Sequence, residues 1–195
     1  MQDVANKPVP KDRLDSFADG VFGFAMTLLV VNLDLPEDFT PAGATELTDA
    51  LLDLGDTFLV YVITFVVLGS FWIGRAQANA PVTASVPLVW TFLVHLFFVT
   101  LMPFSVVLIA RYEFAPAIWA YGGNMIFLAL TAMSIRLVSA RDGGSQFRVR
   151  DGTGYLLLIA SAILSAAIAA FNVDYAMAAY LINLAPFLLA NGSRE

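Results

Sequence analysis

The stretch that decides the fold is RLDSFADGVFGFAMTLLVVNLDL, residues 13–35. It is apolar enough to cross a membrane, yet Asp19 lies near its start and Gly20 and Gly23 follow directly. A charge inside a membrane segment is costly and normally faces protein or water, with a partner. Glycines on such a helix let another backbone approach closely. The stretch therefore predicts a first helix that contacts other helices, with Arg13 or Arg75 as the partner of Asp19.

The composition of the whole chain supports a membrane protein. Of its 195 residues, 59% are hydrophobic and only 13% are charged, whereas soluble domains are about a quarter charged. Because there is no cysteine and His95 is the single histidine, disulfides, thiolate sites and a histidine metal cluster within one chain are excluded. We expect no bound metal, no cofactor and no enzyme activity.

Six apolar segments are close to the roughly 20 residues that a helix needs to cross the hydrocarbon. No alternating β-barrel pattern is present, so a helix bundle remains as the way to span the bilayer. The sequence thus predicts an all-α integral membrane protein in which residues 1–195 form a single six-helix domain. The expected spans are residues 14–35, 57–74, 86–110, 115–138, 154–171 and 175–190. A further short helix is expected in the acidic loop between the first two spans.

Charge asymmetry gives the expected orientation. If the N-terminus is cytoplasmic, nine of the ten Lys and Arg residues lie on the inner side, and only Arg111 lies outside. Both termini are therefore expected in the cytoplasm, with the protein in a cell inner membrane. The lipid bilayer is an expected partner, and nucleic acid is not.

The first helix has two distinct faces, because each residue turns an ideal helix by about 100°. Relative to Phe24, an apolar stripe falls within about 40°, and Thr27 lies about 60° to one side. The stripe consists of Phe17, Gly20, Phe24, Leu28, Val31 and Leu35. Asp15 and Asp19 fall on the opposite face; Asp15 is interpreted as part of a solvated helix start. Spacing alone does not distinguish a lipid-facing stripe from a hydrophobic pore constriction.

Three motifs resemble the transmembrane protein 175 family of potassium channels. In the first span, Arg13, Phe17 and Asp19 match a motif of arginine, three residues, then Phe-Ser-Asp, although Ala18 replaces the serine. The second and third spans contain further matches, namely Tyr61, Thr64, Phe65 and Trp72, and then Pro103 and Phe104. Arg75 and Ala76 stand where that family has histidines. The resemblance covers about residues 13–105.

This resemblance implies a homotetramer in which the first helix of each subunit lines a central pore and potassium is the permeant ion. It places Phe24, Leu28 and Val31 at rings of apolar side chains that constrict the pore, and it puts the Thr27 hydroxyl in a pore-facing position. Such constrictions gate by dewetting. It also implies a structural polar network at the cytoplasmic end of the helix. The members of that network are Arg13, Phe17, Asp19, Trp72 and Arg75.

Three other interpretations remain open at this stage. A proton- or cation-coupled secondary transporter would use Asp19, Arg75 or His95 as a relay and would show saturable, coupled flux. A membrane enzyme would have few candidate catalytic side chains, since the chain has one histidine and no cysteine. A non-conducting structural protein would have its axis closed by Phe24. For His95 itself, a hydrogen bond to a neighbouring helix and a proton-sensing role are both considered.

Overall fold

The computed structural model describes residues 9–31, 33–35, 38–77, 83–143 and 149–184, with the backbone alone for 149–151. In chain order the elements are β1 (Val9–Pro10), α1 (Lys11–Val30), α2 (Ala44–Asp53), α3 (Gly55–Ala76), β2 (Thr83–Ala84), α4 (Val86–Arg111), α5 (Ala115–Arg141), α6 (Val149–Ala169) and the 3₁₀ helix η1 (Ala176–Leu184). The two short strands pair antiparallel, with Val9 opposite Ala84. Apart from that pair, the regular structure of the described residues is helical, as expected.

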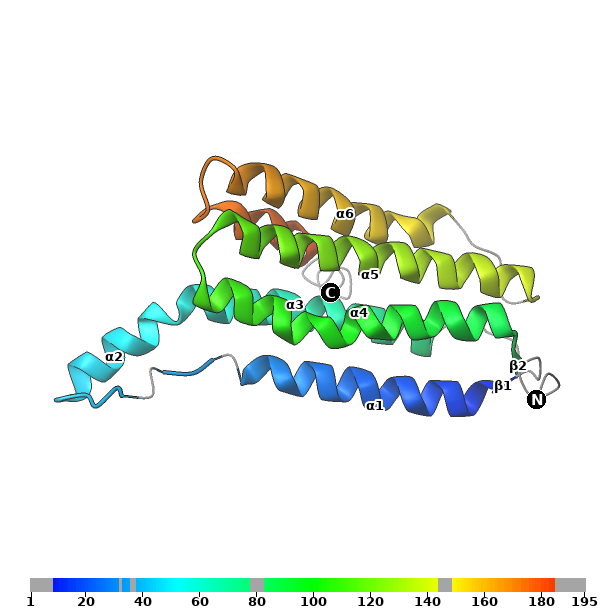
Figure 1. Cartoon of the computed structure of the whole chain (residues 1–195), viewed down its shortest axis with the longest axis horizontal. Coiled ribbons are helices and arrows are strands. Elements are labelled where there is room, and N and C mark those ends of the chain that lie inside the picture. Colours follow the sequence, from blue (N-terminus) through cyan, green and yellow to red (C-terminus); the bar gives the residue numbers. More distant parts are fainter. Residues whose placement is uncertain (1–8, 32, 36–37, 78–82, 144–148, 185–195) are drawn as a thin grey trace, which may run out of the picture.

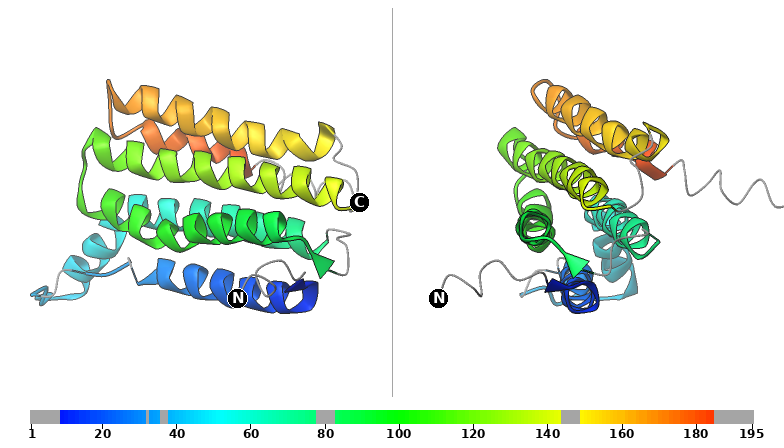
Figure 2. Two further views of the ribbon diagram at one scale, coloured as in Figure 1. Left: turned by 45° about the vertical axis from the view of Figure 1, so that its right-hand side comes forward. Right: turned by 90° about the vertical axis from the view of Figure 1, so that its right-hand side faces the viewer.

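The long helices lie side by side and reverse direction from one to the next along the chain (Figure 1). The start of α1 therefore lies at the same end of the bundle as the ends of α3 and α5. Seen from that end, α1 occupies one edge of the bundle and α6 the other (Figure 2). α2, the expected short helix, projects beyond the opposite end (Figure 1).

One face of α1 anchors it to the bundle. Its buried residues are Ala18, Phe22, Ala25 and Leu29, spaced by four, three and four, which is the repeat of a helix that packs along one side. They join a core cluster with residues of the other long helices, and α4 is the main neighbour of α1. This packing fixes which side of α1 faces away from its own chain.

In the part of the chain that the structure describes, four helices are long and apolar enough to cross a membrane. They are Gly55–Ala76, Val86–Arg111, Ala115–Arg141 and Gly152–Ala169, and they correspond to the second to fifth expected spans. α1 falls outside this set because Arg13, Asp15 and Asp19 crowd its first half. It also ends at Val30, five residues before the expected Leu35, and Val31 forms its C-cap.

The sixth expected span, residues 175–190, is only partly described. Residues 176–184 form a 3₁₀ helix packed on α6 and α3, in place of the expected α-helix. Residues 185–190 of that expected span lie outside the described residues.

Candidate functional site

The outward face of α1 carries a row of large apolar side chains. Phe24 is 74% exposed, Leu28 is 47% exposed and Val31 is 67% exposed in the single chain. Because the core residues of α1 lie on its other side, these three side chains point away from their own bundle. With a rise of about 1.5 Å per residue, the row from position 24 to 31 is about 10 Å long.

The hydroxyl of Thr27 is exposed on the same side of α1. Its Oγ1 donates a 2.9 Å hydrogen bond to the carbonyl oxygen of Phe24. Because this bond uses the hydroxyl proton within the helix, the oxygen lone pairs are what Thr27 can offer to an ion or to water.

A charged cluster ties the start of α1 to the end of α3. The Arg75 guanidinium donates from Nη2 to Asp19 Oδ1 at 2.6 Å and from Nη1 to Asp15 Oδ1 at 2.7 Å. Trp72 Nε1 donates to the same Asp19 oxygen at 3.0 Å. The Arg75 side chain is 16% exposed and its guanidinium lies 5.4 Å from the centre of the Phe92 ring. Two carboxylates thus surround one mostly buried cation, and a second cation, Lys11, lies with its Nζ 3.5 Å from Asp15 Oδ2, so that two negative and two positive charges balance.

The structure brings together three of the five residues expected in the network, namely Asp19, Trp72 and Arg75. Phe17 and Arg13 are exposed, and among the described residues Arg13 takes part in no ion pair. The sequence interpretation missed Asp15, which it treated as a solvated helix start. Its spacing of four residues from Asp19, which puts both carboxylates on one side of the helix, was the available signal.

The two glycines of α1 serve no close contact within the chain. A Cβ added at Gly20 or Gly23 would meet no atom within 4 Å. Among the described residues the expected close backbone approach is therefore absent within one chain, and both glycines lie on the exposed part of α1.

His95 is buried in the middle of the bundle. Its Nδ1 lies 2.8 Å from the Thr131 hydroxyl of α5, so it makes a hydrogen bond between helices, one of the two roles considered for it. A cavity of about 70 Å³ beside it is lined by Arg75, Arg136 and aromatic side chains among others. A hollow of that size holds about two water molecules.

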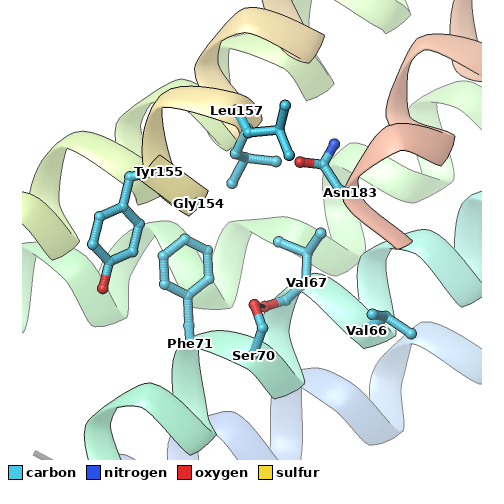
Figure 3. A pocket seen from close by; sticks show the side chains of 9 residues that line it. Val66, Val67, Ser70, Phe71, Gly154, Tyr155, Leu157 and Asn183 are labelled. Carbon is cyan, nitrogen blue, oxygen red and sulfur yellow. Dashed lines mark hydrogen bonds between the residues drawn. The ribbon is translucent and has the colours of Figure 1, made fainter. Parts of the chain in front are cut away.

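A second, larger hollow of about 210 Å³ lies between α3, α6 and η1 (Figure 3). Val66, Val67, Phe71 and Leu157 give it mainly apolar walls, and Asn183 lines it from η1. The Asn183 Nδ2 already donates to Ser161 Oγ at 2.8 Å and to the Tyr180 carbonyl at 3.2 Å. The Ser70 hydroxyl also lines this hollow, and its Oγ donates to the Val67 carbonyl at 2.7 Å. The described residues contain no group of three or more His, Cys, Asp or Glu side chains that could hold a metal ion.

Comparison with known proteins identifies the relatives of this chain. The family described as the endosomal/lysosomal potassium channel TMEM175 matches residues 13–103. Residues 13–103 therefore resemble the TMEM175 family. The matched region contains both the outward row of α1 and the cluster around Arg75, and it agrees with the extent of the motifs expected from the sequence.

The curated proteins that this chain resembles are bacterial and animal proteins. A protein of Chryseobacterium sp. (strain P1-3) named as a potassium channel is 28% identical over 145 residues, which are 72% of this chain and 71% of the relative. A potassium channel of Chamaesiphon minutus is 31% identical over 131 residues, covering 64% of this chain and 63% of its own length. The human protein, named as an endosomal/lysosomal proton channel, is 32% identical over 72 residues, or 34% of this chain and 14% of its own.

A solved structure has the same fold. The crystal structure of a lysosomal potassium-selective channel TMEM175 homologue from Chamaesiphon minutus superposes with a TM-score of 0.72 at 20% identity. The match covers 92% of this chain and 96% of that one. The family is one of ion channels and not of enzymes.

Proposed function

We propose that this chain is one subunit of a homotetrameric, potassium-preferring channel that conducts passively, and that α1 of each subunit lines the central pore. Residues 1–195 then form a single transmembrane domain with six spans, in which α1 and the segment that begins with η1 join the four strongly apolar helices. The protein lies in a cell inner membrane with both termini in the cytoplasm.

The observation that carries this proposal is the outward row of Phe24, Leu28 and Val31. These side chains belong to a helix at the edge of the bundle, within the region that matches a channel family. Four such helices meeting at an axis would stack rings of apolar side chains about 6 and 4.5 Å apart along the pore. The exposed Gly20 and Gly23 leave room for neighbouring copies of α1 to approach.

The length of α1 is consistent with a membrane-crossing role. Its 20 residues correspond to about 30 Å, the thickness of the hydrocarbon core. Asp19 is tolerable inside it because Arg75 and Trp72 hold its carboxylate. The cluster thereby fastens the inner end of the pore helix to its own subunit, while the apolar rings act as a hydrophobic gate.

The distribution of charge along the bundle supports the orientation. Lys11, Arg75, Arg136 and Arg141 belong to the start of α1 and the ends of α3 and α5, at one end of the bundle. The opposite end carries the acidic α2 and Arg111. Under the positive-inside rule the basic end is cytoplasmic.

The test is ion flux through purified protein in liposomes, with potassium inside and sodium outside. Wild type should give a potassium-preferring current, and Phe24→Ala should increase it by opening the narrow ring. Phe104→Ala is the matched control, because Phe104 is an equally large exposed side chain on α4 and should leave the current unchanged. Saturable flux coupled to protons would instead indicate a transporter, and silence of correctly inserted protein would refute conduction.

A further inference from the structure

α2 has an apolar face that its own chain leaves uncovered. It lies beyond the end of the bundle (Figure 1) and none of its ten residues is buried. Leu47 and Leu51, one turn apart, are 38% and 55% exposed. With 100° per residue, they share one side of α2 with Ala50. An amphipathic helix of this kind needs a partner to bury its apolar side.

Two of the three acidic residues of α2 border this face on one side. Glu46 and Asp53 are seven residues apart, so they lie on one line, about 100° from the centre of the apolar face. Asp49 and Leu52 point away from that face, by roughly 150°. α2 contains no basic residue, so a surface that accepts it should offer apolar groups flanked by a cation.

The corner between α4 and α5 is such a surface at the same end of the bundle. Tyr112 is 52% exposed and Phe114 is 67% exposed. Arg111, the last residue of α4, is exposed and makes no ion pair with any described residue. Within the described part of the chain it is also the one basic residue at this end. The corner thus presents two aromatic rings beside one cation, with Glu113, which is also exposed, between the two aromatic residues in the sequence.

We propose that α2 of one copy docks on the α4–α5 corner of a second copy. Leu47 and Leu51 pack on Tyr112 and Phe114, and Arg111 pairs with the Glu46–Asp53 edge. A second copy is favoured over the membrane surface by charge, because interfacial helices use Lys and Arg to bind anionic lipids and α2 has only acidic charges. This inference rests on the proposed tetramer. Because residues 31–43 connect α1 to α2 in the sequence, the docked α2 would restrain the outer end of the pore helix.

Cysteine cross-linking tests this contact, because the chain has no native cysteine. A copy with Leu51→Cys and one tag is co-expressed with a Phe114→Cys copy that carries another tag, and the membranes are oxidised. Since each chain has a single cysteine, a band with both tags can form only between copies. A disulfide requires Cα atoms within about 7 Å, so a single pair of positions could miss a real contact. Cysteines at Leu47 or Leu51 in one copy are therefore each combined with cysteines at Tyr112 or Phe114 in the other, which gives four pairs.

The control replaces Leu51→Cys by Leu52→Cys, which is on the opposite side of α2 and is more exposed, at 72%. We expect at least one of the four pairs to cross-link and the Leu52 pairs to fail. Arg111→Asp in the Phe114→Cys copy should abolish the product. Asp53→Lys in the other copy should restore it, and Asp49→Lys should not.

Oligomeric state and potassium flux are measured on the same wild-type protein. A conducting tetramer in which none of the four pairs cross-links, or in which Leu52 cross-links equally well, overturns this inference and leaves the proposed function intact. A monomer that carries no current overturns both. Restoration by Asp49→Lys would overturn the assigned orientation of α2.

Discussion

Arg75→Met should loosen the attachment of α1 without unfolding the bundle. The substitution removes three hydrogen bonds, to Asp15 Oδ1, to the Asp15 carbonyl and to Asp19 Oδ1. It also removes the cation–π contact with Phe92. Methionine is unbranched and preserves most of the aliphatic part of the Arg75 side chain, so the packing around that part is retained.

The expected loss follows from the exposure of the partners. Each hydrogen bond contributes a net ~0.5–1.5 kcal/mol and the cation–π contact ~0.5–1 kcal/mol. The side chains of Asp15 and Asp19 are 37% and 56% exposed, so water replaces part of what they lose. The lower half of these ranges therefore applies, and we expect a loss of about 2–4 kcal/mol, at or below the ~3–5 kcal/mol of a fully buried pair broken on one side.

The assay is unfolding of the purified protein by SDS titration in mixed micelles, monitored by tryptophan fluorescence. Arg141→Met is the control: Arg141 is exposed and has no ion pair among the described residues, so its replacement should change stability by less than about 0.5 kcal/mol. A double-mutant cycle with Asp19→Asn should give a coupling energy of at least about 0.5 kcal/mol. Equal stability of Arg75→Met and Arg141→Met, or a coupling near zero, would refute the structural role of the cluster.

The remaining predictions compare neighbouring positions. Leu29→Ala should destabilise the fold by about 2–4 kcal/mol because Leu29 is fully buried, whereas Leu28→Ala should cost less than about 1 kcal/mol and change conduction instead. SDS unfolding and liposome flux are measured on both variants. A large loss of stability in Leu28→Ala together with changed conduction in Leu29→Ala would contradict the assigned faces of α1. Gly122→Ala should destabilise, since its Cβ would lie 3.3 Å from the Tyr180 hydroxyl and 3.5 Å from a backbone carbonyl. Gly123→Ala has open space and should be neutral or stabilise by up to about 1 kcal/mol through helix propensity. Thermal unfolding that ranks Gly122→Ala as the more stable variant would show that α5 packs differently.

Periodicity within the sequence predicted the features that depend on local geometry. The register of α1 follows from a 100° turn per residue, so Phe24, Leu28 and Val31 were expected on one face, and all three are exposed in the single chain. The four strongly apolar helices also followed from length and composition, with ends within a few residues. The resemblance to the TMEM175 family could be found from the sequence because each of the matched motifs is short and nearly continuous in the chain, and the family model matches the same region.

Features that depend on distant residues were harder to predict. Arg75 is 60 residues from Asp15, and nothing in the sequence decides which of two carboxylates on one helix face it reaches, so the pairing with both was missed. Gly20 and Gly23 were expected to admit a neighbouring backbone, but helix spacing does not say whether that neighbour belongs to the same chain. Residues 176–184 form a 3₁₀ helix that packs on α6 and α3, and the hydrophobicity of this segment does not distinguish a 3₁₀ helix from an α-helix.

The most direct test of the proposed function is the accessibility of the α1 row to a charged, water-soluble reagent during conduction. Val31→Cys is introduced into the cysteine-free chain, reconstituted in liposomes and treated with a trimethylammonium methanethiosulfonate. If four copies of α1 line the pore, the added positive charges should abolish potassium current and a reducing agent should restore it, while Phe104→Cys on α4 should conduct normally throughout. A current that is insensitive to modification at Val31, or that is blocked equally through Phe104→Cys, would contradict a pore lined by α1.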